Sequence, residues 1–490
     1  MKNITELTFD NTYRNLPEDF YQIVNPTPFD NPYFIAFNSD ASKLIDINLN
    51  DSNRARYLDF LSGKKIIAGE QPIALYYTGH QFGVYNKDIG DGRAILLGEI
   101  RNSSNEKWDI HLKGAGRTRY SRNFDGRAVL RSTIREYLCS EAVYSLGIPT
   151  TRALCIIGSD EEVYREKTEF GAMMIRMAQS HVRFGSFEGF HYNGQHENIK
   201  ILADYVIDNH YPEIRNDGEK YKLFLFNVAK STANLIANWQ AIGFTHGVMN
   251  TDNMSIIGLT LDYGPYGFME NFNQDFTPNH SDHFGRYNYR NQPSIGYWNL
   301  QKLLQCFKII ISDKESQETL ELYKNIYFDS YYKLMLKKLG LTNVKDKDKK
   351  FVDNTVKIIE RYSVDYTIFF RQLSNFDKSS KSIKNKFLKR LSLLNSDFYE
   401  WFMQYKKRLE EETSTDIERK KLMDSINPKY ILRNYITEEV IRKAEDKNDH
   451  SEIEKTRNIF KKPYDEQPEF DEYAKESPEW AKNLVISCSS

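Results

Sequence analysis

The sequence predicts an α+β protein built in two lobes, a strand-rich lobe followed by a helical lobe. Between about residues 70 and 175, short apolar runs alternate with glycine-rich and polar turns, as in β-strands. From about residue 196, apolar residues recur at helical spacing over long stretches. A chain of 490 residues is long enough for two or three folding units, and 40% hydrophobic residues can form large cores.

Charge and cysteine content argue against several classes of protein. The formal net charge of −1 gives no support for binding to nucleic acid or to a membrane surface. The start of the chain lacks the apolar run of a signal peptide, and no apolar stretch approaches the ~20 residues of a membrane span. The cysteines at 139, 155, 306 and 488 are too scattered for a disulfide scaffold or a zinc site. We therefore expect a cytoplasmic protein with no nucleic-acid partner and no membrane segment.

We expect four segments along the chain. Residues 1–65 are polar and rich in proline, and they are predicted to form an N-terminal arm with a short helix near 50–62. Residues 66–190 form the strand-rich lobe, and residues 191–312 form the helical lobe. Residues 313–490 form a helical C-terminal region, whose lysine-rich stretches are interpreted as solvated surface. The acidic, aromatic tail from residue 455 is either disordered or draped over the surface.

Two strands and the helix that follows them bring a lysine near a glutamate. The runs 94–100 and 108–113 alternate as strands, and Lys113 ends the second strand on its polar face. In the next helix, Glu136 lies on a flank of small side chains that can approach this sheet. Paired with Glu136, the Lys113 ammonium would point toward phosphate oxygens, although each residue taken alone is more often plain surface charge. The core stripe of the same helix is Leu130, Ile134, Leu138, Ala142 and Leu146, with Asp125 at or close to its N-cap.

Glycines and clustered positive charge favour a bound polyanion. Gly90 and Gly92 lie in a Gly-Asp-Gly-Arg loop between strand candidates, where backbone can approach a phosphate; a plain hairpin turn is the alternative. Arg176 and Arg183, from a second predicted strand pair (153–159 and 171–178) and just after it, would add guanidinium forks to the same anion. Positive charge also gathers before Glu136, with only Asp125 opposing it: Lys113, Arg117, Arg119, Arg122, Arg127, Arg131 and Arg135.

Residues 245–267 resemble the metal-binding segment of a kinase with one residue changed. The pattern His-Gly, Asn253 and Asp262-Tyr-Gly is complete, but Val248 stands where kinases carry the catalytic aspartate. The apolar run 255–261, broken by Gly258, predicts a two-strand ribbon that places Asn253 and Asp262 side by side. An amide oxygen beside a carboxylate suits Mg²⁺. Ordinary turn chemistry is the alternative for both residues.

The order of these pieces is that of a protein kinase, so the prediction becomes a bilobal, protein-kinase-like fold. It comprises a small lobe with a Gly-rich loop, a helical large lobe with a metal site, and a helical C-terminal extension. Valine can neither accept nor orient a proton, and Asp252 is the only carboxylate nearby. Three interpretations remain open from the residues: a conventional kinase, a non-catalytic ATP-binding pseudokinase scaffold, or different chemistry on ATP with Asp252 as base.

The sequence resembles the selenoprotein O family, also called YdiU, of protein adenylyltransferases. The resemblance spans nearly the whole chain and is weakest over 313–400. It implies a kinase-like fold that binds ATP in a flipped orientation, passes AMP to Ser, Thr or Tyr hydroxyls of proteins, and releases pyrophosphate. The stretches that carry it are 76–99, 111–142, 146–154, 180–188, 246–268, 281–303, 427–435 and the terminal Cys-Ser-Ser.

The resemblance also implies roles for individual residues. Asp252 would accept the proton, while Asn253 and Asp262 would hold Mg²⁺, with Mn²⁺ as an alternative metal. Cys488 matches a position where some eukaryotic relatives carry selenocysteine, which implies a redox role for the tail. ATP would be held by Gly90, Gly92, Arg93, Lys113, Asp125, Gly126, Arg176 and Arg183, with Glu136 paired to Lys113 and Asp262 reaching the nucleotide through the metal.

Overall fold

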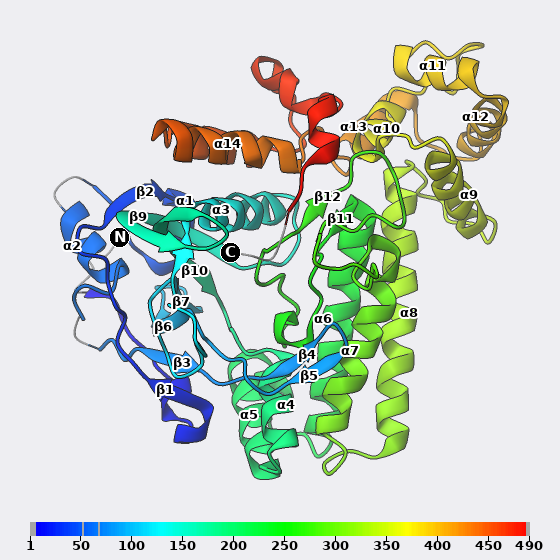
Figure 1. Cartoon of the computed structure of the whole chain (residues 1–490). Coiled ribbons are helices and arrows are strands. Elements are labelled where there is room, and N and C mark those ends of the chain that lie inside the picture. Colours follow the sequence, from blue (N-terminus) through cyan, green and yellow to red (C-terminus); the bar gives the residue numbers. More distant parts are fainter. Residues whose placement is uncertain (1–5, 51–52, 67–68, 487–490) are drawn as a thin grey trace.

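The structure, a computed structural model, describes residues 6–50, 53–66 and 69–486. It combines a sheet-rich part with a helical part, as the α+β prediction requires (Figure 1). The main sheet is antiparallel, and the strands predicted at 94–100, 108–113, 153–159 and 171–178 are confirmed. Its order is β1 (Tyr21–Ile23), β3 (Ile73–Leu75), β6 (Ala94–Arg101), β7 (Lys107–Lys113), β10 (Thr168–Ala178), β9 (Arg152–Tyr164) and β2 (Tyr33–Phe37), with β8 (Ala128–Val129) paired to β10.

The N-terminal segment belongs to this sheet instead of forming a separate extended arm. Its strands β1 and β2 lie at the two ends of the sheet order, beside β3 and β9. Helix α2 (Arg54–Leu61) is the short helix predicted near 50–62, and its Tyr57 and Phe60 are buried against one face of the sheet. Short strands at both ends leave little unpaired backbone exposed, which lowers the tendency of the sheet edges to pair with other chains.

Helix α3 (Leu130–Ser145) crosses the other face of the sheet with its predicted stripe facing inward. It is buried on nearly all sides because α14 (Asn434–Lys447) and α15 (Ser451–Phe460) also pack on it. Asp125 is not its N-cap, contrary to the prediction. The strand β8 intervenes and makes Val129 the N-cap residue, while Asp125 accepts the Arg127 N–H at 2.8 Å and pairs with Arg165.

The helical part begins with α4 (Phe184–Tyr192), α5 (His196–His210) and α6 (Lys220–Ile242), and continues with α7 (Gln292–Cys306) and α8 (Asp313–Lys338). These confirm the prediction that the chain becomes helical from about residue 196. In Figure 1, α6, α7 and α8 lie side by side, and α6 packs against both others. Helix α6 ends at Gly243, whose φ of 75° is left-handed and suits glycine.

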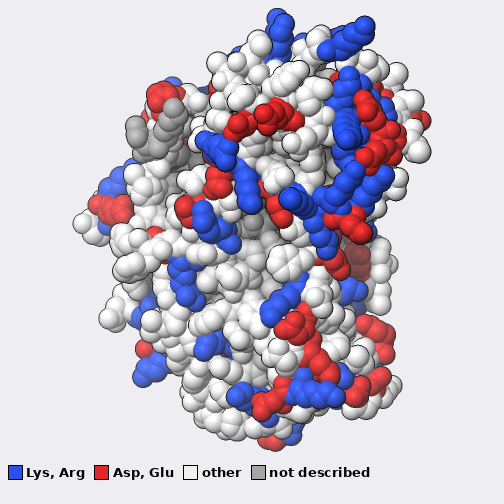
Figure 2. All heavy atoms as spheres, turned by 90° about the vertical axis from the view of Figure 1, so that its right-hand side faces the viewer, with Lys and Arg blue, Asp and Glu red and all other residues white. Residues whose placement is uncertain are grey.

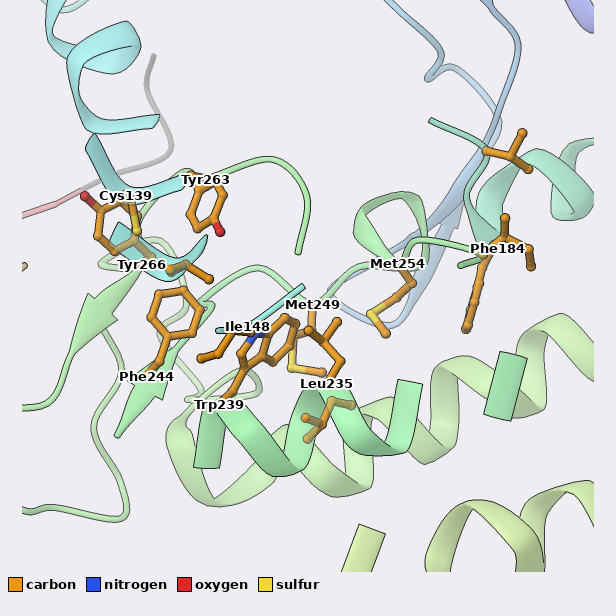
Figure 3. Close-up of a cluster of buried hydrophobic side chains, with 14 of the residues drawn as sticks. Cys139, Ile148, Phe184, Leu235, Trp239, Phe244, Met249, Met254, Tyr263 and Tyr266 are labelled. Atoms are coloured by element: carbon orange, nitrogen blue, oxygen red, sulfur yellow. The ribbon is translucent and has the colours of Figure 1, made fainter. Parts of the chain in front are cut away.

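An apolar cluster fixes the segment 245–263 on α6. In Figure 3, Leu235 and Trp239 of α6 lie beneath Met249 of this segment. Met254, from the same segment, lies above α6 further along the helix axis. Trp239 Nε1 also donates to Thr260 Oγ1 at 3.1 Å. The predicted two-strand ribbon at 255–261 is absent: a single bridge joins Met254 to Thr260, and a turn between Ser255 and Gly258 takes up the residues between them.

The C-terminal region has its own apolar core. It is built by α9 (Asp348–Arg361), α10 (Tyr366–Leu373), α11 (Lys386–Leu394), α12 (Ser396–Leu409) and α13 (Asp416–Asp424). The lysine-rich stretches lie largely at the surface, where Lys347 pairs with Glu411 and Lys384 with Asp377. Figure 2 shows Lys and Arg interspersed with Asp and Glu on the face it draws, so no single sign dominates there.

The tail was predicted to begin at residue 455, but residues 455–460 belong to α15; only the chain after α15 is draped over the surface, which is one of the two predicted alternatives. It passes through short 3₁₀ turns (Pro468–Ala474 and Glu479–Asn483), and the Ile486 carbonyl accepts the His280 N–H at 3.1 Å. Cys488 lies outside the described residues. Cys139, Cys155 and Cys306 are buried free thiols. Among the described residues, none of the helices combines the length and apolar character needed to cross a bilayer.

Close packing of α6, α7 and α8 depends on Gly296, and this can be tested by substitution. A methyl group at Gly296 would collide with Ile236 Cδ1 and lie 2.5 Å from Tyr323 Oη. We expect Gly296→Ala to lower the free energy of unfolding by about 1–3 kcal/mol, as overpacked cores do. Gly218 is a matched control because a methyl group there meets no atom within 4 Å.

Urea unfolding followed by circular dichroism measures both variants. Gly218→Ala should stay within about 0.5 kcal/mol of the parent chain. Equal losses for the two variants would contradict this description of the three-helix contact.

Candidate active site

A cavity of about 830 Å³ lies between the sheet and the segment 248–265. Seven Lys or Arg residues and five Asp or Glu residues line it, so positive charge exceeds negative charge by two (7 − 5). A cavity of this size suits a nucleotide-sized ligand, and the charge excess favours an anionic one. It is lined by every predicted site residue except Glu136: Gly90, Gly92, Arg93, Lys113, Asp125, Gly126, Arg176, Arg183, Asp252, Asn253 and Asp262.

Glu136 lies behind the cavity wall and holds two of its cations. One carboxylate oxygen pairs with Lys113 Nζ, and the other lies 3.3 Å from Arg176 Nη1. Glu136 is fully buried, and burial alone would raise its pKa. The charges of Lys113 and Arg176 outweigh that effect and hold the pKa of Glu136 below its ordinary value. The predicted pairing of Lys113 with Glu136 is therefore present, as a buried ion pair.

Asp262 lies between two guanidinium groups. One oxygen pairs with Arg176 Nη1, and the other accepts from Arg183 Nη1 at 2.6 Å. Arg183 is the N-cap residue of α4, and the same Nη1 also donates to the Asp252 carbonyl at 2.6 Å. Burial alone would raise the pKa of Asp262, but the neighbouring arginines and Lys113 hold it well below its ordinary value. Both arginines predicted to serve a bound anion thus lie beside the predicted metal ligand.

Asp252 has a different environment from Asp262. Its burial raises the pKa to about 7, although Arg183 and a hydrogen bond from Gln81 act in the opposite direction. One carboxylate oxygen accepts from Gln81 Nε2 at 3.2 Å, and the other has no hydrogen-bond partner among the described residues. A carboxylate that lines a cavity and has a pKa near neutrality can act as a general base.

The metal prediction rests on Asn253 and Asp262, which both line the cavity. Asn253 Nδ2 donates to the Val248 carbonyl at 2.9 Å, which leaves the amide oxygen as its ligand atom. Within the described residues, no group of three or more His, Cys, Asp or Glu side chains is arranged to hold a metal ion. A cation bound here would therefore need further oxygen ligands from water or from a phosphate.

A buried histidine links the Gly-rich loop to Arg176, and the sequence analysis missed it. Arg176 Nε donates to His111 Nδ1 at 2.9 Å, and His111 Nε2 lies 2.9 Å from Asp91 Oδ2. Because Nδ1 accepts a hydrogen bond, the proton of the neutral ring is on Nε2. Burial lowers the pKa of His111 to about 4. The only sequence signal for this network is that His111 alternates with Lys113 on the polar face of the same strand.

The glycines of the Gly-rich loop serve close packing in this structure. The loop is not a plain hairpin turn, because the strands on its two sides belong to different sheets. A methyl group at Gly90 would lie 2.6 Å from the Tyr120 ring, and one at Gly92 would lie 2.8 Å from the Tyr120 carbonyl oxygen. At Gly126, where φ is 73°, a side chain would collide with the Gly116 backbone. These positions let two loops lie against each other at the cavity wall.

Only part of the predicted positive cluster faces the cavity. Lys113, Arg122 and Arg127 line it. Arg131 instead pairs with Glu169 on β10, and the Arg135 guanidinium lies 4.7 Å from the centre of the Tyr266 ring. Further lining residues that the sequence analysis did not single out are Gln81, Phe82, Tyr120, Phe124, Tyr164, Arg165 and Asn250.

Comparison with known proteins gives similarity over the whole chain. A family model described as "Protein adenylyltransferase SelO" matches residues 3–460. Proteins named "Protein nucleotidyltransferase YdiU" from Thiobacillus denitrificans and Myxococcus xanthus are 47% and 46% identical over 490 residues, covering 100% of both chains in each case. One of the same name from Herminiimonas arsenicoxydans is 46% identical over 492 residues, covering 100% of this chain and 98% of its own.

Because the pKa of His111 is depressed, we expect the free energy of unfolding to fall at low pH. Its ordinary pKa of 6.5 falls to about 4 in the folded chain, so only the unfolded chain gains this proton between those values. The stability that the depressed pKa of His111 contributes is complete above pH 6.5 and is lost as the pH falls toward 4. We expect the parent chain to lose about 2 kcal/mol more stability between pH 7 and 5 than the variant His111→Gln.

Urea unfolding at several pH values measures this difference. Glutamine can still accept from Arg176 but does not titrate, so it serves as the matched control. Identical pH dependence in the two proteins would contradict a neutral, buried His111.

Proposed function

The chain belongs to the selenoprotein O (YdiU) family of nucleotidyltransferases, and from this premise we propose that it transfers AMP from ATP to Ser, Thr or Tyr hydroxyls of proteins. The observation that carries the proposal is the position of the charges. Cations crowd the buried end of the cavity around Lys113, while a carboxylate suited to proton transfer stands at Asp252 and none stands at Val248. The chain order of these pieces supports a kinase-like arrangement of the two lobes.

The buried cations favour a flipped nucleotide. The β- and γ-phosphates carry most of the negative charge of ATP, so they gain most from Lys113, Arg176 and Arg183. These side chains are 7%, 4% and 1% exposed, and cations so buried interact strongly with an anion that excludes water. With the outer phosphates held there, the α-phosphate lies nearer the mouth of the cavity, where an acceptor hydroxyl can reach it.

Asp252 supplies the proton chemistry in this proposal. The acceptor hydroxyl oxygen attacks the α-phosphorus, the bond from the α-phosphorus to the α,β-bridging oxygen breaks, and pyrophosphate leaves with that oxygen. The hydroxyl proton passes to the carboxylate of Asp252, which lines the cavity. The products are an AMP ester of the protein and pyrophosphate. Valine at 248 does not interfere, because the γ-phosphate is not transferred.

The donor set fits Mg²⁺, with Mn²⁺ as an alternative. Asn253 offers an amide oxygen and Asp262 a carboxylate, and both line the cavity where the phosphates would complete the shell. A bound Mg²⁺ would screen phosphate charge and stabilise the leaving pyrophosphate. Asp262 would then exchange its guanidinium partners for the metal, and Arg176 and Arg183 would turn to the phosphates.

Labelled ATP separates this function from a conventional kinase and from a non-catalytic scaffold. With Mg²⁺, and with casein or the chain itself as acceptor, label from the α-phosphate should become protein-bound and label from the γ-phosphate should not. Asp252→Asn should reduce α-label transfer about 10²- to 10⁴-fold, the usual contribution of a general base. Val248→Asp should gain no γ-label transfer.

The opposite labelling pattern would contradict the proposal. Transfer of γ-label by the parent chain would favour a kinase, and ATP binding without any covalent label would favour a scaffold. Full α-label transfer by Asp252→Asn would remove Asp252 from the mechanism.

A further inference from the structure

A small hairpin stands apart from the main sheet and reaches the segment that carries Asp252. It consists of β4 (Gly79–Gln81) and β5 (Val84–Asn86), which form their own two-stranded sheet. Its turn residues Phe82 and Gly83 have φ values of 50° and 85°, as in the tight two-residue turns that match the twist of a hairpin. In Figure 1 the hairpin lies beside α4 and α7, away from β3 and β6, which flank it in the chain.

The hairpin backbone is held directly against residues 250–252. His80 N–H donates to Thr251 Oγ1 at 2.6 Å, and Phe82 N–H lies 3.3 Å from Asn250 Oδ1. A methyl group at Gly79 would lie only 2.9 Å from the Asp252 nitrogen, so this approach requires glycine. These contacts fix the hairpin relative to the candidate base.

Two further contacts, made by Glu188 and Tyr287, hold the hairpin in place. His80 Nδ1 lies 2.8 Å from Glu188 Oε2, and both side chains are buried. Tyr287 Oη accepts the Phe82 N–H at 2.8 Å and itself donates to Asn250 Oδ1 at 2.6 Å. The hairpin is thus joined to α4 and to the segment before α7, and it has little freedom to move independently of them.

Gln81 extends from this hairpin to the carboxylate of Asp252. Its Nε2 donates to Asp252 Oδ2 at 3.2 Å, and its Oε1 accepts from Asn86 Nδ2 at 3.1 Å. Asn86 therefore determines which end of the Gln81 amide faces Asp252. With Oδ2 occupied in this way, Oδ1 is the carboxylate oxygen that has no partner among the described residues.

We propose that Gln81 is a positioning residue, which acts through Asp252 by fixing the orientation of the carboxylate that receives the proton of the acceptor hydroxyl. This inference rests on the proposed function, in which Asp252 is the base. Asn86 acts one step further back, by orienting the Gln81 amide. The sequence analysis assigned no role to either residue, because their contacts form only when the hairpin packs on the segment 250–252.

Variants of Gln81 and Asn86 test this role through turnover of α-labelled ATP. Gln81→Ala should lower kcat about 10- to 100-fold, as expected for one hydrogen bond to a charged group, with KM for ATP and the unfolding midpoint unchanged. Asn86→Asp should be nearly as impaired, because the new carboxylate would draw the Gln81 NH₂ group away and turn its oxygen toward Asp252. Asn86→Ala should lower kcat less, since the Gln81 amide can still keep its hydrogen bond to Asp252.

A control variant and a comparison with Asp252→Asn make the outcomes distinguishable. Val84→Ala changes an exposed residue of β5 and should leave kcat unaltered. Full kcat in Gln81→Ala, while Asp252→Asn is impaired, would overturn the positioning role and leave the proposed function intact. Full kcat in Asp252→Asn would overturn the base assignment and this inference with it. Parallel loss of kcat, ATP binding and stability in Gln81→Ala, or equal kcat in the two Asn86 variants, would assign these residues a purely structural role.

Discussion

Glu136 and Asp262 are buried carboxylates that stay ionised because Lys113, Arg176 and Arg183 surround them. An isolated charge would be costly to bury at either position, so each member of this network depends on the others. The five residues come from β7, α3, β10, the N-cap of α4 and the turn after Thr260. The ion-pair network therefore joins the sheet, the helix behind it and the segment below the cavity into one wall.

The same network explains why the site suits a polyphosphate. Its cations outnumber its carboxylates, and His111 fixes Arg176 from behind through a neutral ring. In the proposed function, the phosphates of ATP would balance that excess. Asp252 lies outside the ion pairs, and its pKa near 7 separates its chemistry from that of Asp262. In the proposed mechanism, the charged carboxylate of Asp262 serves binding and the titrating carboxylate of Asp252 serves proton transfer.

Local patterns were enough to predict the parts of the site that one element or one motif defines. Strand alternation placed Lys113, and the offset of Glu136 from the apolar stripe predicted that it faces the sheet. Contacts between distant segments could not be read in this way. The sheet edges formed by β1 and β2, the pairing of Asp125 with Arg165, and the Gln81 hairpin all depend on tertiary packing. The prediction of a ribbon at 255–261 was wrong because residues 255–258 form a turn, which leaves a single bridge between Met254 and Thr260.

The proposed function depends on the orientation of ATP in the cavity. A crystal structure with Mg²⁺ and the α,β-methylene analogue of ATP would show this orientation. This analogue keeps the triphosphate charge but cannot release pyrophosphate. We expect the β- and γ-phosphates to contact Lys113, Arg176 and Arg183, with the α-phosphorus as the phosphorus nearest to Asp252. A γ-phosphorus nearest to Asp252, with the α-phosphate at the buried cations, would contradict it.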